Sequence, residues 1–513
     1  GGKQSLWLRQ VAISSNVRLL PLADVQYLAC GFSADGDFIY YGMGDGKKLP
    51  SLYKLPVLGG SPTLVIGDLT APVAQSPDGK QLAIVHLDRE KQEVTLSVAN
   101  MDRTGERKLM SRKFPEFFDW IAWSPDGQSI ACPVSGFTDG NPQIKIVEVR
   151  VSDGSEKVIS TQRWLSGGQV VWLPDKSGLV MSARSQDASF DRLWHISYAT
   201  GEVQTITNDL SDYRGVSISA DSTALVSVQT QRLANIWLSK SAKDHDATQV
   251  TPGVGNYYDL AWTTDDRILF SSDAGGSADI WEVGTDGTNQ RQLTAGAARN
   301  YGPVASADGR YILFHSDRSG TWQIWRMDRD GSNPRQLTAD GPESTWAQVT
   351  PDSKWVVYQH LNAKFKITLW KVGIDGGTPV ELTDKISLRP SVSPDGKWIA
   401  CWRYDEPPNT SMQIVIVPAD GGEAVKSFAL PPYAMAGWDA AVRWNADGSA
   451  VTYVDQPQGL GNILSQPIAG GEPTQLTHFK EHQILSFNWL RDGRLVCSRG
   501  FRASDAVLIK EVR

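Results

Sequence analysis

The residue types that usually carry out catalysis occur in this chain without the spacing that catalysis needs. The sequence lacks the G-x-S-x-G pattern of serine hydrolases and the H-R-D, D-F-G and Gly-rich motifs of protein kinases. Its seven histidines are scattered, and none lies at metal-ligand spacing from another histidine or from a cysteine. Asp328 and Asp330 resemble the start of a calcium loop, but the later ligands are missing. We therefore expect no catalytic residue, no metal and no cofactor.

A second group of residues suits binding instead. Tyrosines, tryptophans, arginines and aspartates recur shortly before a series of turn aspartates. Tyr and Trp offer flat apolar area with a polar tip, and Arg and Asp add directional hydrogen bonds, which suits a peptide, a glycan or a protein ligand. In the alternative interpretation, the aromatic residues pack inside the fold and the charges are solvated. The candidate ligand-binding residues are Tyr27, Trp120, Tyr213, Arg214, Tyr258, Asp259, Tyr301, Trp346, Arg389, Trp438 and Asp439.

The turn aspartates mark a repeat that fills the chain. One copy, Gly302–Thr338, consists of short stretches of alternating apolar residues separated by turn sequences such as Asp308-Gly309 and Asp330-Gly331. Each marker aspartate is expected to accept hydrogen bonds within its own turn. Eleven copies occur, 43 to 52 residues apart, at Asp35, Asp78, Asp126, Asp175, Asp221, Asp265, Asp308, Asp352, Asp395, Asp447 and Asp492.

Each copy predicts a four-stranded antiparallel sheet with two apolar faces. Such a sheet is stable only when a similar sheet packs on either side, which predicts an all-β fold, a β-propeller with almost no helix. In a propeller the first strand of each blade lines the central channel. The candidate ligand-binding residues should therefore gather at the channel mouth.

About eleven blades exceed the four to eight that one propeller ring usually holds. We therefore expect two rings, with one large ring as the alternative. The N-terminal propeller should span residues 1–253, with about five blades and N-terminal closing strands, and the C-terminal propeller should span residues 254–513, with about six blades. A nested arrangement, in which the last blade belongs to the first ring, is also open.

The two ends of the chain look like incomplete blades. Residues 5–20 resemble the third and fourth strands of a repeat, whereas residues 487–513 supply the first two strands and a third, AVLIKEV. One end could therefore complete a blade that the other begins, which would leave no open sheet edge. Because the chain begins with Gly1 rather than Met, we also expect it to derive from a longer protein.

Composition narrows the possible partners. The net charge of -7 and the absence of a Lys/Arg block argue against nucleic acid, and no apolar run is long enough to span a membrane. The four cysteines, Cys30, Cys132, Cys401 and Cys497, occupy apolar strand positions in different repeats, so we expect four buried free thiols.

The repeat resembles the TolB-like, or PD40, branch of the WD40-like propellers. The resemblance rests on the S-P-D-G turn, an I-W pair, a D-G turn and a Q-L-T ending, best seen in residues 263–294, 306–338 and 393–422. The opening GKQSLWLRQVAISSNVRLL and the following GFSADGDFIYYG also resemble the extracytoplasmic propeller of bacterial membrane-anchored serine/threonine kinases. Related propellers also follow winged-helix domains in membrane-bound transcription regulators.

These resemblances imply a non-catalytic sensor or interaction module on the periplasmic or extracellular side of a bacterial membrane. The fragment itself would not contact the membrane but would be tethered through a preceding helix. Two other functions stay open: a TolB-like scaffold that works only through protein contacts, and a hydrolase or lyase with its site in the channel.

Overall fold

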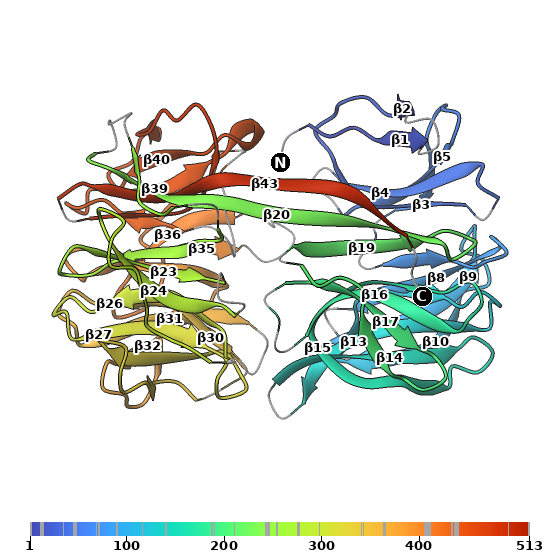
Figure 1. Cartoon of the computed structure of the whole chain (residues 1–513), viewed down its shortest axis with the longest axis horizontal. Helices are drawn as coiled ribbons and strands as arrows, with labels where there is room; N and C mark the ends of the chain where they lie inside the picture. Colours follow the sequence, from blue (N-terminus) through green and yellow to red (C-terminus); the bar gives the residue numbers. More distant parts are fainter. Residues whose placement is uncertain are drawn as a thin grey trace. The chain divides into compact units, whose positions relative to one another are not determined.

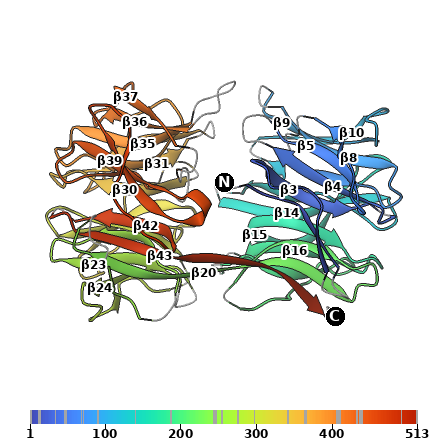
Figure 2. The same cartoon turned by 90° about the horizontal axis from the view of Figure 1, so that it is seen from above.

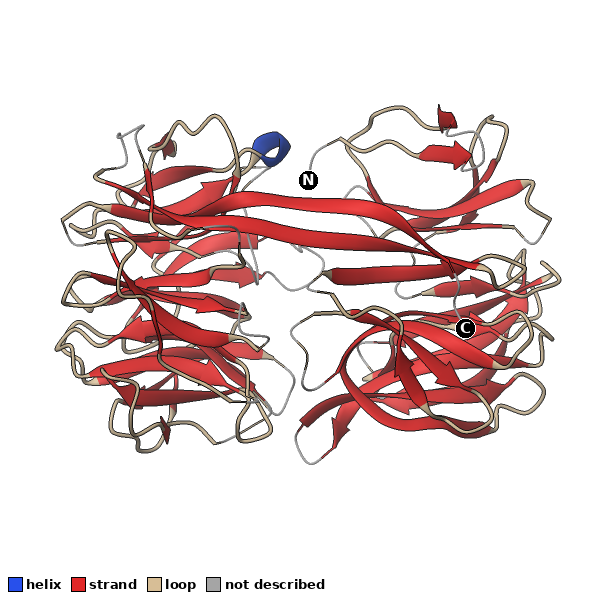
Figure 3. Cartoon of the chain, viewed as in Figure 1, coloured by secondary structure: helices blue, strands red, loops and turns tan. Residues whose placement is uncertain are grey.

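The computed structural model contains strands almost exclusively (Figure 3). It describes residues 3–10, 15–33, 35–44, 49–67, 69, 72–88, 91–114, 116–138, 141–185, 188, 190–209, 211–241, 247–252, 255–273, 277–296, 298–339, 341, 343–362, 366–404, 412–431, 434, 441–490 and 492–510. Among these residues the single helical element is the short 3-10 turn Pro457–Gly459. The predicted all-β fold is confirmed.

The chain forms two compact units. Unit 1 contains Gly1–Gln231 and Ser504–Arg513, and unit 2 contains Arg232–Ala503. We expected one boundary after residue 253, whereas the division falls within two long strands, β20 (Ala224–Ser239) and β43 (Leu495–Lys510). Neither division point carries a Gly or a Pro, and at Ser504-Asp505 the strand continues although both residue types are common in turns, so the local sequence does not mark this location.

Five sheets of unit 2 are antiparallel meanders of four strands. Their strands are β22 (Tyr258–Trp262), β23 (Arg267–Ser272), β24 (Asp279–Gly284) and β25 (Arg291–Gln292); β26 (Asn300–Ala305), β27 (Tyr311–Ser316), β28 (Gln323–Asp328) and β29 (Arg335–Gln336); β30 (Glu343–Val349), β31 (Trp355–Leu361), β32 (Ile367–Gly373) and β33 (Val380–Glu381); β34 (Ser387–Val392), β35 (Trp398–Tyr404), β36 (Met412–Pro418) and β37 (Lys426–Ala429); β38 (Arg443–Trp444), β39 (Ala450–Asp455), β40 (Asn462–Pro467) and β41 (Thr474–Gln475).

A further sheet closes unit 2 into a ring from distant parts of the chain. In it, β42 (Gln483–Trp489) pairs with β43, β43 with β20, and β20 with β21 (Thr248–Gln249); β20 and β43 lie side by side in both views (Figures 1 and 2). Asn488 Nδ2 donates to the Leu260 carbonyl of β22 at 3.1 Å. Trp489 Nε1 donates to Thr452 Oγ1 of β39 at 2.8 Å. The C-terminal strands therefore fill the place between the first and the last meander.

Unit 1 contains two meanders and a larger sheet. The strands are β3 (Gln26–Phe32), β4 (Phe38–Gly44), β5 (Ser51–Pro56) and β6 (Thr63–Ile66); β7 (Val73–Gln75), β8 (Gln81–Asp88), β9 (Glu93–Asn100) and β10 (Arg107–Lys113); β11 (Phe117–Phe118), β12 (Ala122–Trp123), β13 (Ser129–Thr138), β14 (Asn141–Arg150), β15 (Glu156–Trp172), β16 (Gly178–Ser185), β17 (Arg192–Ser197) and β18 (Val203–Thr205). The first half of β15 pairs with β14 and its second half with β16, so one strand ends one blade and begins the next.

The two chain ends differ in how well the sequence anticipated them. The N-terminal segment forms the two expected strands, β1 (Trp7–Gln10) and β2 (Ser15–Arg18), as a hairpin. At the other end we expected the second and third strands of the last repeat to be separate. They form the single strand β43, which continues through Gly500, so this glycine does not end the strand. The remaining strand of unit 1, β19 (Asp212–Ile218), pairs with β20.

The marker aspartates stabilise their own turns, as predicted. Ser306 Oγ donates to Asp308 Oδ1 at 2.6 Å, and the same oxygen accepts the Arg310 backbone N–H at 3.1 Å. Hydrogen bonds of this kind lower the pKa of Asp221 to about 2, so the carboxylate stays charged. The same 2.6 Å contact recurs at Ser76–Asp78, Ser124–Asp126, Ser219–Asp221, Thr350–Asp352 and Ser393–Asp395.

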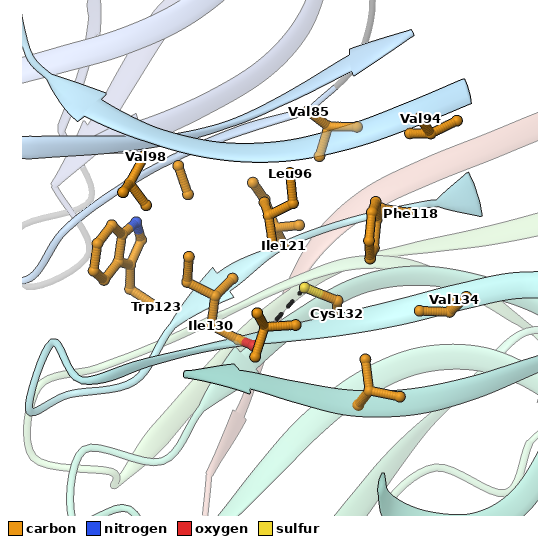
Figure 4. Packing of buried hydrophobic residues seen from close by; sticks show 13 residues of the cluster. Val85, Val94, Leu96, Val98, Phe118, Ile121, Trp123, Ile130, Cys132 and Val134 are labelled. Atoms are coloured by element: carbon orange, nitrogen blue, oxygen red, sulfur yellow. Dashed lines mark hydrogen bonds between the residues drawn. The ribbon is translucent and has the colours of Figure 1, made fainter. Parts of the chain in front are cut away.

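Neighbouring sheets pack face to face through apolar side chains. Figure 4 shows Val85 and Leu96 of β8 and β9 opposite Ile130 and Cys132 of β13. Tryptophans before the marker turns add a hydrogen bond between sheets, since Trp123 Nε1 donates to the Ala74 carbonyl at 3.1 Å. The indole of Trp444 bonds to the preceding sheet in the same way, and the indole of Trp172 bonds to the Ala122 carbonyl of β12 within the larger sheet. Burial of both sheet faces is the physical reason that the repeat forms a ring.

The expectation that all four cysteines are buried is wrong for Cys30. Cys132, Cys401 and Cys497 are buried free thiols, whereas Cys30 is exposed on β3, between the exposed Leu28 and Phe32. The alternation of apolar residues placed Cys30 correctly on a strand. This alternation could not show that the side chains on this face of β3 are exposed to solvent.

This difference predicts selective thiol chemistry. Burial raises the pKa of Cys401 and Cys497 to about 12, so their reactive thiolates are scarce at neutral pH, and partial burial raises the pKa of the accessible Cys30 as well. We expect a maleimide to label one thiol per folded chain and four after denaturation, as counted by mass spectrometry. Cys30→Ser should abolish the native labelling; labelling that persists in this variant would contradict the assignment.

Candidate functional site

The first strands of four consecutive sheets in unit 2 share one backbone irregularity. In β22, β26, β30 and β34 the pairing register shifts by a β-bulge. Each bulge contains a residue with positive φ: Asp259 at 52°, Gly302 at 65°, Trp346 at 58° and Arg389 at 54°. Positive φ costs a residue with a side chain about 1 kcal/mol or more, and such bulges redirect side chains. Three chemically distinctive side chains are therefore presented from equivalent positions.

These positions converge on one cluster at the centre of the ring. Arg389 Nη1 lies 3.6 Å from Asp259 Oδ1, and the guanidinium carbon lies 3.1 Å from the ring centroid of Trp346. The backbone N–H of Gly302 donates to Asp259 Oδ2 at 3.3 Å. Four strands that are far apart in sequence thus contribute to one ion pair with a stacked indole, which we call the central cluster.

Arg443, at the start of β38, adds a second guanidinium to the central cluster. Burial, together with the nearby charge of Arg389, lowers its pKa to about 10, whereas Asp259 opposes the shift. Nη1 donates to the Val442 carbonyl at 3.1 Å, but the buried Nε has no partner among the described residues. Among the described residues, two guanidinium groups and one carboxylate thus belong to the central cluster.

His315 of β27 packs against aromatic rings beside the central cluster. Its ring lies 4.7 Å from that of Trp346 and 6.1 Å from that of Tyr301. Burial, with the nearby charge of Arg389, lowers its pKa to about 3, so the imidazole is neutral at physiological pH. Gly302 is required here, since a Cβ would lie 2.8 Å from His315 Nδ1. A histidine with so low a pKa is a poor general base at neutral pH.

Comparison with protein families identifies this propeller. Residues 246–431 match the family model PD40, the TolB beta propeller domain. Residues 246–431 therefore resemble a TolB-type β-propeller, and we call the unit that contains them, unit 2, the TolB-type domain. The matched range lies within unit 2 and includes the bulges of Asp259, Gly302, Trp346 and Arg389. The predicted resemblance of the repeat is thereby confirmed.

The chain is also similar to several solved structures. It is 17% identical to TolB from Acinetobacter baumannii over 77% of this chain and 76% of that one, with a TM-score of 0.28. It is 19% identical to the putative TolB from Agrobacterium tumefaciens over 56% of this chain and 88% of that one, with a TM-score of 0.23. It is 13% identical to an oligogalacturonate lyase in complex with manganese over 72% of this chain and 96% of that one, with a TM-score of 0.32. No curated protein matches the chain in sequence.

The candidate residues of the TolB-type domain divide into three sets. Asp259, Trp346 and Arg389 meet in the central cluster. Tyr258 and Tyr301 contact each other edge to face, with ring centroids 6.2 Å apart, and the Tyr258 hydroxyl donates to Asp273 Oδ2 at 3.4 Å. The last two, Trp438 and Asp439, lie outside the described residues.

The candidate residues in unit 1 fit better the alternative interpretation, in which aromatic side chains pack inside the fold and charged side chains are solvated. Tyr213 is buried in an apolar cluster and donates its hydroxyl hydrogen to Asp209 Oδ2 at 2.8 Å. Tyr27 packs edge to face on a buried tyrosine, Trp120 is half-buried, and Arg214 is exposed. Among the described residues no hydrogen bond, ion pair or ring contact joins these four candidates to one another.

Gly302, His315 and Arg443 belong to the cluster but were not among the candidates. Gly302 stands six residues before its marker aspartate, as do Asp259, Trp346 and Arg389, so strict use of this offset would have found it. His315 and Arg443 lie at other offsets. Only the ring geometry brings their side chains to the centre.

The described part of the chain contains no group of three or more His, Cys, Asp or Glu side chains arranged to hold a metal ion. It also contains no helix with the length and apolarity needed to span a bilayer.

A half-buried carboxylate in unit 1 predicts a pH-dependent stability. Burial raises the pKa of Asp119 to about 6, although Ser135 donates a hydrogen bond to it. An unfolded chain ionises this group near pH 4, so the free energy of unfolding should fall as pH rises from about 4 to 6. Asp119→Asn should remove that fall and stabilise unit 1 at pH 7 by about 1–3 kcal/mol in denaturant unfolding.

The control for this prediction is Asp102→Asn, because Asp102 is exposed and its pKa is lowered by hydrogen bonds from Thr104. This variant should keep the fall in stability between pH 4 and 6. An unchanged pH profile in Asp119→Asn would contradict the prediction.

Proposed function

We propose that the TolB-type domain of this chain is a protein-interaction module that receives an acidic group of its partner at the central cluster. The similarity of residues 246–431 to the TolB beta propeller domain supports a role in contacts with other proteins. The observation that supports this proposal is that two arginines, Arg389 and Arg443, stand close enough to affect each other's charge, together with the buried Arg443 Nε that has no partner in the described residues. A carboxylate from a partner would accept a hydrogen bond from this Nε.

The geometry favours a carboxylate over other anionic or polar groups. A guanidinium presents a planar fork of donors that matches two carboxylate oxygens, and charge-assisted hydrogen bonds of this kind are the strong ones. Arg389 is held in place by its contacts with the Trp346 ring and with Asp259. Little side-chain entropy would be lost on binding because this arginine is already fixed.

We propose that the domain acts by binding and not by catalysis. The carboxylate of the cluster is paired with Arg389 and the imidazole of His315 is a weak base, so no acid-base pair suited to neutral pH stands at the centre among the residues described there. The alternative, a lyase or hydrolase with its site in the channel, makes a different prediction. Metal analysis of the purified chain should find less than one bound metal ion per chain if the binding function is correct.

A more specific form of the proposal follows from the N-terminal sequence. Its resemblance to the propellers of membrane-anchored serine/threonine kinases supports a sensor on the periplasmic or extracellular side, whereas a winged-helix parent would make it the sensor of a transcription regulator. The reading frame upstream of Gly1 distinguishes these possibilities. A kinase domain followed by a membrane helix would support the first of them, and the lack of both would overturn it.

The test of the proposal is partner capture by the immobilised full chain. Envelope proteins retained by the wild type should be lost from the double variant Arg389→Met/Arg443→Met. The control is Arg335→Met, because Arg335 is an exposed arginine on β29 of the same unit. Equal capture by all three chains would overturn the central cluster as the binding site.

A further inference from the structure

A cavity in unit 2 lies between the sheet β34–β37 and the sheet β38–β41, away from the central cluster. Its volume is about 350 Å³. The walls are mainly apolar and include two indoles, and two turn aspartates stand at the rim. The residues used in the argument below are Asp395, Trp398, Ile416, Trp444, Asp447 and Gly448.

Both rim carboxylates are charged, and neither forms an ion pair with a described residue. Asp395 Oδ1 accepts from Ser393 Oγ at 2.6 Å, and Asp447 Oδ1 accepts the Ser449 backbone N–H at 2.8 Å. These hydrogen bonds hold the pKa of both carboxyls below the usual range. Within the described part of the chain no lysine or arginine forms an ion pair within 4.0 Å of either carboxylate, although Lys426 lines the same cavity and the charge of Lys397 also lowers the pKa of Asp395.

The equivalent place in unit 1 is filled by a lysine of the chain itself. Lys176 follows a marker aspartate as Gly448 does, and both have positive φ, 61° and 72°. Lys176 Nζ lies 2.6 Å from Asp126 Oδ2 and 5.9 Å from the ring centroid of Trp172. Asp126 and Trp172 correspond in the repeat to Asp395 and Trp444. Gly448 has no side chain, and the space that a lysine occupies in unit 1 is left as the cavity.

Two neighbouring interfaces in unit 2 are also filled by a cation. Lys371 Nζ lies 5.1 Å from the Trp355 ring and 2.8 Å from Asp420 of the next sheet. Similarly, the Arg326 guanidinium lies over the Tyr311 ring and forms an ion pair with Asp375 of the next sheet. The residue at the corresponding register position beside Trp398 is Ile416. An aromatic wall is therefore present at this interface, but an isoleucine stands where the other interfaces carry a cation.

We propose that this cavity binds a basic side chain, lysine or arginine, of a partner polypeptide. The alkyl stem would lie against Trp398 and Trp444, and the charged end would reach Asp395 and Asp447. Long basic side chains bury their stems on apolar surface, and cations bind over indole rings, so the cavity matches both parts of such a side chain. The site is independent of the central cluster and of the function proposed for it.

The test uses two blocked tripeptides, acetyl-Gly-Lys-Gly-amide and its norleucine analogue, with the full chain. Ile416 and Ile468 line the cavity, so isoleucine methyl NMR signals report on binding, with Ile468 assigned through Ile468→Val. The lysine peptide should shift these signals and bind at least about fivefold more tightly than the norleucine peptide, because only the ammonium can pair with the carboxylates.

Two variants distinguish the contribution of the carboxylate charges to binding from that of the empty space in the cavity. Asp395→Asn/Asp447→Asn keeps the turn acceptors but removes the charges, and should weaken lysine-peptide binding by at least about fivefold. Gly448→Lys places the chain's own lysine in the cavity, as at Lys176, and should abolish binding. The proposal is overturned if neither peptide shifts the methyl signals, if both bind equally well, or if Gly448→Lys binds like the wild type.

Discussion

Replacement of Gly500 by valine is expected to unfold unit 2 selectively, with a loss of about 3 kcal/mol or more. Gly500 lies in β43, where a Cβ would overlap the Leu233 carbonyl oxygen and lie 2.6 Å from the Ala234 Cα of β20. Backbone atoms of a paired strand cannot move aside like the end of a flexible side chain. The two strands would have to separate, which opens the sheet that closes the ring.

The measurement is denaturant unfolding followed by the tryptophan fluorescence of the full chain. Gly31→Val is the matched control, because Gly31 also lies in a strand but no described atom lies within 4 Å of the position that its Cβ would take. It should shift the transition by about 1 kcal/mol at most. Equal effects of the two substitutions would show that β43 does not close unit 2 against β20.

Arg389→Met is expected to destabilise unit 2 by about 3 kcal/mol and to weaken partner binding by about a hundredfold. The stability loss arises because Asp259, whose side chain is only 15% exposed, loses the cation that faces it at 3.6 Å. The binding loss arises because the partner's carboxylate loses a guanidinium, and truncating one member of a buried charge pair typically costs about 2–5 kcal/mol. Chemical denaturation and partner titration measure the two effects separately.

The double variant Arg389→Met/Asp259→Asn distinguishes these effects. Removing both charges leaves no unpaired carboxylate, so most of the stability should return, and asparagine tolerates the positive φ of position 259. Binding should stay weak because the guanidinium is still absent. Recovery of binding together with stability would mean that Arg389 acts only through folding, and would remove it from the proposed site.

The sequence alone determined the four-stranded meander of the repeat. The marker aspartates and the strands around them are local features, because each turn is held by a Ser or Thr, an Asp and a backbone N–H within five residues. The alternation of apolar residues placed two faces on each sheet, and from this the propeller followed. The offset to the marker turn likewise predicted Asp259, Trp346 and Arg389 as inward residues.

Only the tertiary structure decided how the rings close and which side chains meet. The boundary between the units lies inside β20 and β43, and closure joins strands more than 200 residues apart, for which no turn or composition signal exists. Cys30 is exposed, and His315 and Arg443 reach the centre, because of what the neighbouring sheets cover. Local periodicity specifies a strand and its faces, but the partner of a face is set by contacts between distant residues, which no short stretch of sequence contains.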